Sequence, residues 1–189
     1  MIKYMYNFNS KVYIIGRGNF IMSKINQELE DMTSEILLNN DMYKIPVNII
    51  KIANANDIKV YEGNLDKKIS GAIIYSAEDD RFDILVNRSD AKVRQRFTIA
   101  HELGHYFLHK EMLKKDEFHI DTILYRDEST KDGEAKKREQ EVDYFAGALL
   151  MNRTLLENIR NEHSIGELAE IFNVSVSAMT VRLDILGIL

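Results

Sequence analysis

The 189-residue sequence contains no cysteine, no tryptophan and only one proline. Without cysteine the chain can form neither a disulfide nor a thiolate metal site, so a bound transition metal needs nitrogen and oxygen ligands. No uninterrupted apolar run is long enough to span a bilayer, and the N-terminus lacks the basic, apolar and small-residue order of a secretory signal. These absences predict a cytoplasmic protein without a membrane segment.

Basic residues are outnumbered by acidic ones, 25 against 30, which gives a formal net charge of −5. A negative chain has no bulk affinity for the phosphate backbone of nucleic acids. Hydrophobic residues make up 45% of the sequence, which is enough for one sizeable core with at most a small appendage.

The stretch His101-Glu-Leu-Gly-His105 has the spacing of half a zinc site. Residues four apart project from one face of a helix, separated by about 6 Å along its axis. His101 and His105 can therefore converge on one ion, and Glu102 can act as a base toward a water bound there. The alternative is an amphipathic helix that carries two histidines by chance, and a third ligand is needed to decide.

Glu139 and Asp143 lie four residues apart on a second segment whose apolar spacing predicts a helix. With Glu139 as third ligand, Asp143 would lie one turn later, where it could accept the outer N–H of a ligating histidine. Glu141 is the rival ligand, but it points about 160° away from that face. Alone, the segment reads as the solvated face of a charged helix. Together with the histidine motif, the metal interpretation is favoured.

The other histidines are weaker ligand candidates. His109 continues the stripe of His101, but about 12 Å further along the axis, which is too far to share its ion. His119 and His163 stand among polar residues and are expected at the surface. The expected metal ligands are therefore His101, His105, Glu139 and a water molecule.

The run from Arg94 to His109, followed by Glu139-x-x-x-Asp143 and Leu-Leu-Met151, resembles the ImmA/IrrE family of metallopeptidases. The resemblance covers residues 23–189. It implies a zinc endopeptidase of bacteria or mobile elements that cleaves a helix-turn-helix repressor and relieves repression. By position, the matching zinc ligands are His101, His105 and Glu139, and the matching catalytic glutamate is Glu102.

Three departures from the family pattern leave the ligands untouched. Asp143 stands where the family commonly has Asn, and Val142 stands where it commonly has Ala. Asn152 stands where a Pro often follows the Leu-Leu-Met run. The first departure leaves open whether Asp143 orients a ligating histidine.

The predicted fold class is α+β: a mainly helical, zincin-like metallopeptidase core with a small antiparallel sheet, plus a C-terminal helix-turn-helix-like hairpin. We expect residues 1–22 to be an N-terminal extension of uncertain order, with Met22 as a candidate start. Residues 23–158 would form the metallopeptidase domain and residues 159–189 the C-terminal lobe.

Local signals predict the individual elements. Apolar spacing indicates a helix over 23–40 with Ser23 as its N-cap, and Pro46 can open a second helix. Short β-branched or aromatic runs predict strands at 58–61, 72–75 and 82–86, the last two joined by a hairpin turn at 77–80.

The histidine helix is expected to begin at a cap formed by Ser89 or Asp90. Gly104 within it costs helix propensity, about 1 kcal/mol relative to Ala, and is read as room for a neighbouring strand. Residues 111–137 are expected to be a connection that includes the charged run 126–133.

The C-terminal segment fits a helix-turn-helix pattern, with Ala169 in the first helix, a turn at 173–175, and Met179 in the second helix. Residues 164–189 carry three acidic side chains and one arginine, Arg182, a net charge of −2. A DNA-reading module should be basic, so DNA binding is disfavoured. The hairpin is expected to pack on the core or to help hold the substrate.

The resulting hypothesis is metal-assisted peptide hydrolysis. Zinc would polarise the scissile carbonyl, and Glu102 would accept the proton of the attacking water and pass it to the leaving amine. Mn²⁺ or Fe²⁺ could occupy the same ligands. Tyr106, Tyr125 and Tyr144 are all eligible by type to stabilise the oxyanion. The expected partner is a helix-turn-helix repressor encoded nearby. Two alternatives stay open: a non-proteolytic regulator or toxin–antitoxin component that binds a partner, and a transcription factor with a structural metal.

Overall fold

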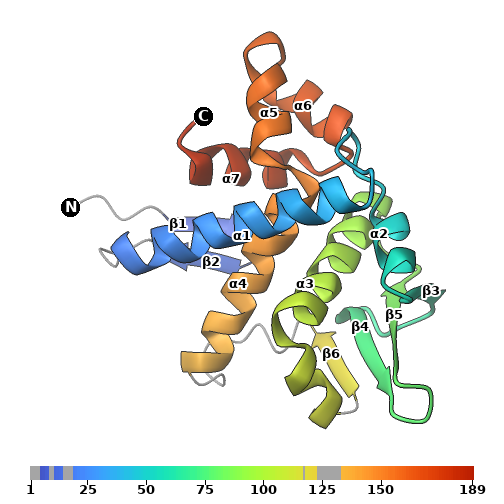
Figure 1. Ribbon diagram of the computed structural model, residues 1–189. Helices are drawn as coiled ribbons and strands as arrows, with labels where there is room; N and C mark the ends of the chain where they lie inside the picture. Colours follow the sequence, from blue (N-terminus) through green and yellow to red (C-terminus); the bar gives the residue numbers. More distant parts are fainter. Residues whose placement is uncertain (1–4, 9–10, 15–18, 117, 123–132) are drawn as a thin grey trace.

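The computed structural model describes residues 5–8, 11–14, 19–116, 118–122 and 133–189, with helices predominating (Figure 1). The helices are α1 (Asn19–Asn39), α2 (Ile49–Ala55), α3 (Lys92–Asp116), α4 (Gly133–Leu150), α5 (Arg153–Ile159), α6 (Ile165–Phe172) and α7 (Val176–Leu186), with a 3-10 turn η2 (Arg160–Glu162). The strands are β1 (Met5–Phe8), β2 (Lys11–Ile14), β3 (Lys59–Gly63), β4 (Ile69–Ser76), β5 (Arg81–Asn87) and β6 (Phe118–Thr122).

Four strands form the main sheet in the order β3-β5-β4-β6, and β1 pairs with β2 in a separate antiparallel ribbon. The predicted hairpin is confirmed, since β4 and β5 are antiparallel with Ser76 opposite Arg81. β3 pairs in parallel with β5, because the chain passes from β3 across the end of β5 before β4 begins. The α+β class is therefore confirmed, whereas the sheet is mixed and not wholly antiparallel.

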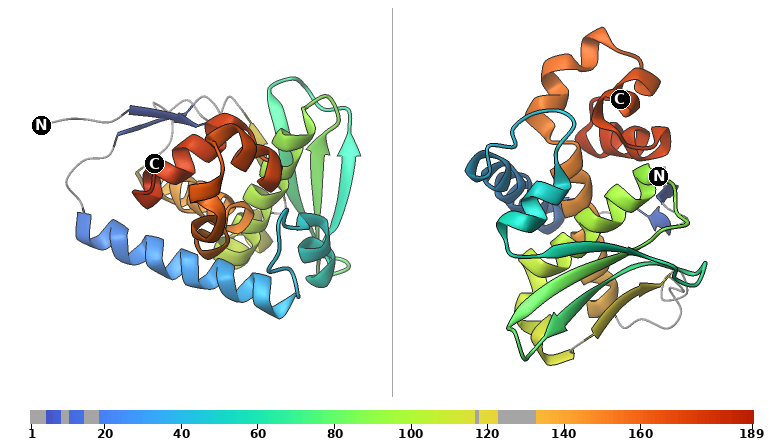
Figure 2. Two further views of the ribbon diagram at one scale, coloured as in Figure 1. Left: turned by 90° about the horizontal axis from the view of Figure 1, so that it is seen from above. Right: turned by 90° about the vertical axis from the view of Figure 1, so that its right-hand side faces the viewer.

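The sheet and α1 lie on opposite sides of the molecule, with α3 and α4 between them (Figure 2). α3 packs on the sheet at Gly71 of β4, where an added Cβ would lie 2.4 Å from Thr98 Cγ2 and 2.8 Å from the carbonyl oxygen of Leu85. Only glycine allows this approach. The C-terminal helices α5–α7 sit over one end of α3 and α4 (Figure 1).

A second tight contact joins α3 to α4 at Gly104. An added Cβ there would lie 3.0 Å from Val142 Cγ1 and 3.1 Å from Phe145 Cδ1. The expectation that Gly104 makes room for a neighbour was right, but the neighbour is a helix and not a strand. The glycine lets the two helices approach closely beside the histidine motif.

Two helix starts differ from the sequence-based expectation. α1 begins at Asn19, so Ser23 lies inside the helix and not at its N-cap. α2 begins after Asn48, whose side chain accepts a hydrogen bond from the backbone N–H of Lys51. Pro46 therefore precedes the cap and does not occupy the first turn, because a nearby asparagine supplies the acceptor that orphaned N–H groups require.

The start of α3 also differs, since neither Ser89 nor Asp90 caps it. The backbone N–H of Arg94 donates to the carbonyl of Ala91, one residue before the helix. The Ser89 hydroxyl instead donates to Asn87 Oδ1 at 2.8 Å, and the Asp90 carboxylate pairs with Arg94 at 3.3 Å. Both predicted caps are thus held by other partners.

The C-terminal lobe has the predicted helix-turn-helix pattern. Ala169 of α6 and Met179 of α7 are both buried, and the chain turns at Asn173 in the left-handed region with φ 54°. Ser164 and Glu167 form a capping box that starts α6. The division of the chain at residues 22 and 158 stays a prediction.

The expected connection over 111–137 contains more structure than its sequence indicated. α3 continues to Asp116, and β6 pairs antiparallel with β4, with His119 opposite Ile73. The charged run 126–133 lies almost wholly outside the described residues. Among the described residues, no helix is both long and apolar enough to cross a membrane.

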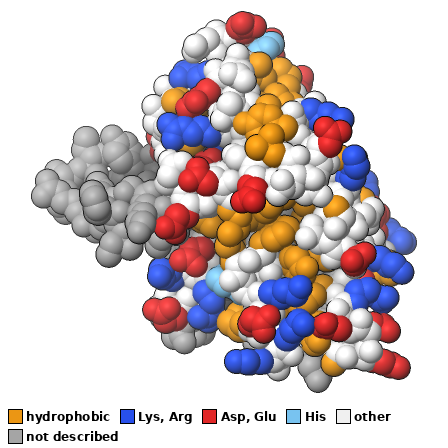
Figure 3. Space-filling view, in the orientation of Figure 1, with side chains coloured by type: hydrophobic (Ala, Val, Ile, Leu, Met, Phe, Trp, Pro, Cys, Tyr) orange, Lys and Arg blue, Asp and Glu red, His pale blue; other side chains and the backbone are white. Residues whose placement is uncertain are grey.

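Apolar side chains are exposed across the middle of the face shown in Figure 3, among scattered acidic and basic ones. α1 contributes exposed apolar residues, with Leu38 64% and Met32 37% exposed. Isolated apolar residues of this kind are common on protein surfaces and need no ligand to explain them.

Candidate metal centre

His101 and His105 lie one turn apart on the middle of α3, and each is 1% exposed. Their Nε2 atoms are 3.1 Å apart, and their rings meet edge to face with centroids 4.8 Å apart. The spacing of four residues therefore directs both imidazoles to one point, as the sequence predicted.

Glu139 reaches the same point from α4. Its Oε2 atom is 3.7 Å from His101 Nε2, and its Oε1 atom is 3.8 Å from His105 Nε2. One ligand atom from each of these residues lies within 4.8 Å of the others. The close approach of α4 to Gly104 brings the carboxylate within reach of the histidines.

These separations fit a bound transition metal. Tetrahedral ligands at about 2.0–2.2 Å from an ion lie about 3.3–3.6 Å from one another. The three measured separations of 3.1, 3.7 and 3.8 Å bracket that range. Two imidazoles and one carboxylate are a donor set typical of catalytic zinc sites, in which a fourth position is left for water.

Asp143 lies where an orienting carboxylate is needed. Its Oδ1 atom is 2.9 Å from His101 Nδ1, and the residue is buried. An ionised carboxylate can only accept, so with a metal bound at Nε2 this hydrogen bond would hold the His101 proton on Nδ1 and direct the Nε2 lone pair to the ligand cluster.

Glu102 follows His101 directly on α3 and is wholly buried. A glutamate is costly to bury and is retained where a partner or a chemical task compensates for its desolvation. Its place beside the first histidine is the one that the sequence motif predicted for a general base.

The weaker candidates lie outside the cluster. Glu141 pairs with Lys137 at 3.8 Å. The His109 ring is 6.0 Å from that of His105, at a kink of α3 where its φ is −133°, and burial lowers the pKa of His109. His163 is half-buried in the connection to α6, and the side chain of His119 lies outside the described part of the chain.

Two of the three candidate tyrosines have other partners. The Tyr106 hydroxyl accepts a hydrogen bond from Lys110 at 3.1 Å, and its ring packs on Phe82 of β5. The Tyr144 hydroxyl donates to Glu30 at 2.7 Å, and burial raises the pKa of Tyr144 to about 12. Tyr125 lies outside the described residues. Of the two candidates that the structure describes, neither is left with its hydroxyl unengaged.

A second ionic cluster, the Glu30 cluster, is formed by Glu30, Tyr144 and Arg182, and no pattern in the sequence predicted it. The Arg182 guanidinium meets Glu30 with two contacts of 2.8 Å and lies over the Tyr144 ring. Its Nε donates to the carbonyl of Met151 at 3.0 Å. This cluster ties α7 to α1 and α4, and its partners are too distant in sequence for any local pattern to reveal.

Comparison with known sequences identifies the chain's relatives. Residues 53–184 match the family described as the IrrE N-terminal-like domain, Peptidase M78. The chain belongs to this family. The resemblance noted from the two motifs is therefore confirmed, and membership indicates a metallopeptidase, which requires a divalent metal.

Two relatives extend the comparison. Over 143 residues the chain is 27% identical to "Metallopeptidase ImmA" of Bacillus subtilis (strain 168), which covers 74% of this chain and 77% of that protein. A solved structure titled "Mycobacterium tuberculosis transcriptional regulator" superposes with a TM-score of 0.58 at 18% identity. That match covers 88% of this chain but 49% of the other, so the chain spans about half the length of that structure and shares its fold.

Proposed function

We propose that this protein is a zinc-dependent endopeptidase that cuts a helix-turn-helix repressor at one site. The observation that carries the proposal is the convergence of His101, His105 and Glu139 within 4.8 Å, beside the buried Glu102. A structural metal site needs no adjacent general base, whereas hydrolysis does.

In the proposed mechanism, each residue of the cluster has a distinct task. Bound zinc would polarise the scissile carbonyl and acidify the attacking water. Asp143 keeps the proton of His101 on Nδ1 through the contact of 2.9 Å, so that Nε2 faces the ligand position. Glu102 accepts a proton from the attacking water and delivers it to the leaving amine.

The proposed substrate is the one that the family resemblance implies. One relative is named a metallopeptidase and the structural neighbour is titled a transcriptional regulator, which supports a regulatory role for a protease of this fold. A repressor encoded beside this protein is the partner that we propose, and its cleavage would relieve repression.

DNA binding by the C-terminal lobe is a poorer hypothesis. Arg182 is the only basic residue of α7, and it is 3% exposed and paired with Glu30. A buried, neutralised arginine cannot contact phosphate, and a duplex-binding helix needs cations on its surface.

The test is incubation of the zinc-loaded protein with the neighbouring repressor, read by intact mass. We expect a single cut by the wild type, and loss of at least about 100-fold in cleavage rate for Glu102→Gln, because general bases contribute about 10²–10⁴-fold. Zinc stoichiometry should stay unchanged in this variant.

Normal cleavage by Glu102→Gln would remove Glu102 from the role of base. If the wild type binds one zinc per chain and leaves the repressor intact, the remaining hypothesis is a regulator that acts by binding. A complex with the repressor, detected by size-exclusion chromatography, would identify that case.

A further inference from the structure

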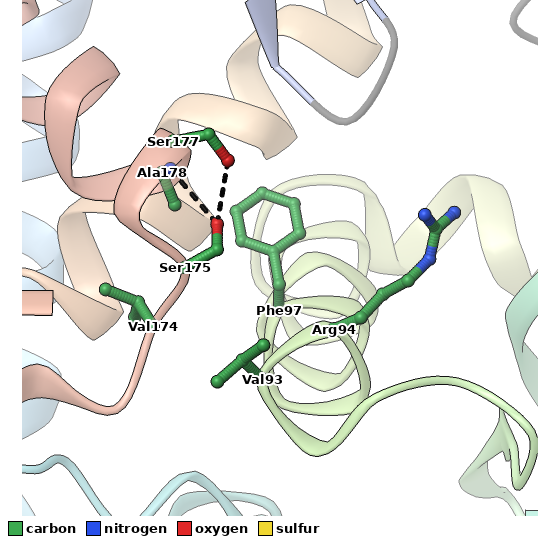
Figure 4. Close-up of a pocket in the computed structure, with 7 residues that line it drawn as sticks. All are labelled: Val93, Arg94, Phe97, Val174, Ser175, Ser177 and Ala178. Carbon is green, nitrogen blue, oxygen red and sulfur yellow. Dashed lines mark hydrogen bonds between the residues drawn. The ribbon is translucent and has the colours of Figure 1, made fainter. Parts of the chain in front are cut away.

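A hollow lies between the first turns of α3 and the turn that leads into α7 (Figure 4). Its apolar walls are Val93 and Phe97 on one side and Val174 and Ala178 on the other. Its cavity volume is about 60 Å³. Pockets for whole small molecules span roughly 300–1,000 Å³, so this smaller hollow suits one side chain.

The polar groups at the hollow are already engaged. The Arg94 guanidinium points away from Phe97 in Figure 4 and contacts Ser70 at 2.8 Å and Asp90 at 3.3 Å. Ser175 Oγ accepts from the backbone N–H of Ala178 and lies 3.0 Å from the Ser177 hydroxyl. The hollow therefore offers apolar contact and not an anion site.

The hollow keeps its shape because α3 is fastened to the turn beside it. Arg96 Nε donates to the carbonyl of Asn173 at 3.1 Å, and a second nitrogen of the same guanidinium donates to the carbonyl of Val47 at 3.0 Å. A cavity built in advance binds its occupant without the cost of ordering its walls.

The hollow also shares a wall with the candidate metal centre. Phe97 precedes His101 by one turn on the same face of α3, and their ring centroids are 6.5 Å apart. One helical turn is about 5.4 Å, and an extended peptide advances about 3.3 Å per residue. A side chain within two residues of a carbonyl held at the metal centre can therefore reach the hollow.

We propose that this hollow is a specificity pocket that accepts an apolar side chain of the substrate peptide, one or two residues from the scissile bond. The inference rests on the proposed function, because it takes the metal centre as the place where the peptide is cut. It assigns selection of the cleavage site to the junction between α3 and the C-terminal lobe.

The test uses binding, so that it does not depend on turnover. Short peptide hydroxamates, which chelate the metal, are varied at the first and second side chain from the hydroxamate, and their Kd values for the zinc-loaded protein are measured calorimetrically. At one of the two positions, leucine should bind about 10- to 100-fold more tightly than glycine or aspartate, as expected for burial of one apolar side chain.

Ser177→Phe should fill the hollow and reduce the leucine-to-glycine ratio to about one, with the glycyl ligand binding as before. Ser177→Ala removes the hydroxyl without filling space and should keep the preference. Val176→Phe is the matched control, because Val176 is 56% exposed, adjacent in the chain and not part of the wall. Val93→Ala enlarges the hollow and should raise binding of phenylalanine relative to leucine several-fold.

A leucine preference that Ser177→Phe leaves unchanged would overturn the pocket, as would no preference at either position. The result is separable from the proposed function: selective hydroxamate binding without repressor cleavage supports the pocket and counts against the proteolytic role. Absence of zinc binding by the wild type would refute both.

Discussion

Helix α4 contributes to two buried polar clusters, and they differ in how their groups are compensated. In the Glu30 cluster, the carboxylate is satisfied by the Arg182 guanidinium and the Tyr144 hydroxyl, all with contacts of 2.7–2.8 Å. In the metal-centre cluster, formed by His101, His105, Glu139 and Asp143, the ligand atoms of the first three lie 3.1–3.8 Å apart around a common point.

The comparison shows two ways in which charged groups buried beside α4 are compensated. A carboxylate that finds an arginine in the same chain forms a closed ion pair, whose role is to hold α7 against α1 and α4. Two imidazoles and a carboxylate whose ligand atoms lie 3.1–3.8 Å apart match the spacing of ligands around an ion of the size of zinc. Geometry at the ligand atoms, more than the residue types, separates the closed ion pair from the candidate metal centre.

Arg182→Ala should have the largest effect, because it disrupts the Glu30 cluster and leaves the metal-centre cluster intact. We expect the free energy of unfolding to fall by about 3–5 kcal/mol, because the substitution leaves Glu30 buried without its countercharge. Urea unfolding followed by circular dichroism measures the change, and zinc stoichiometry of the folded variant should be unaltered.

Arg153→Ala is the control for Arg182→Ala. Arg153 pairs with Glu157 four residues on, with both side chains more than 40% exposed, so its loss should cost at most about 0.5 kcal/mol. Zinc loss from folded Arg182→Ala protein would show that the two clusters are coupled and contradict the separation drawn here.

Glu139→Ala tests the other cluster. Zinc affinity should fall by more than about 100-fold, since a ligand matters more than the orienting partners whose loss costs about 10- to 100-fold. Competition with a chelator measures the affinity. Glu141→Ala, on the same helix and outside the cluster, should bind zinc normally, and weakened binding there would move the third ligand to Glu141.

Asp143→Leu should weaken zinc binding by about 10- to 100-fold through misorientation of His101. Asp143→Asn should cost less than about tenfold, because the amide oxygen can still accept from Nδ1. Equal losses in the two variants, measured by the same chelator competition, would show that the charge of Asp143 matters and its hydrogen bond does not.

Tyr144→Phe removes one hydrogen bond to Glu30 and should lower the free energy of unfolding by about 1.5–3 kcal/mol near neutral pH, less than Arg182→Ala. The folded-state pKa of Tyr144 is raised to about 12 from an ordinary value of 10. The associated stability is fully present below pH 10 and is lost as the pH rises toward 12. Urea unfolding from pH 9 to 11.5 should show a shallower decline for Tyr144→Phe than for the wild type.

The sequence was enough to predict the candidate site residues, because side chains of the required chemical types recur at helical spacing. His101, His105, Glu139 and Asp143 were found because four-residue spacing puts side chains on one helix face, and the structure brings all four together. The C-terminal helix pair was equally visible, since its apolar positions, Ala169 and Met179, and the turn between them are local signals.

Features that depend on distant partners were not predictable. β6 was missed because a short strand among charged residues is defined by its pairing with β4, far earlier in the chain. Ser89 and Asp90 are both good cap residues by type, but Asn87 and Arg94 hold them. Arg182 entered the sequence analysis only as a charge of the C-terminal segment, because its partner Glu30 lies 152 residues away.

The contact at Gly104 limits which substitutions this sequence can accept in evolution. A methyl group at 104 would compete for the same space as Val142 Cγ1 and Phe145 Cδ1, so the three positions share one fixed volume. Substitutions there should be tolerated in compensating pairs, with a larger residue at 104 accompanied by a smaller one at 142 or 145. Related chains should therefore show covariation among these three positions, although none of them is among the candidate metal ligands.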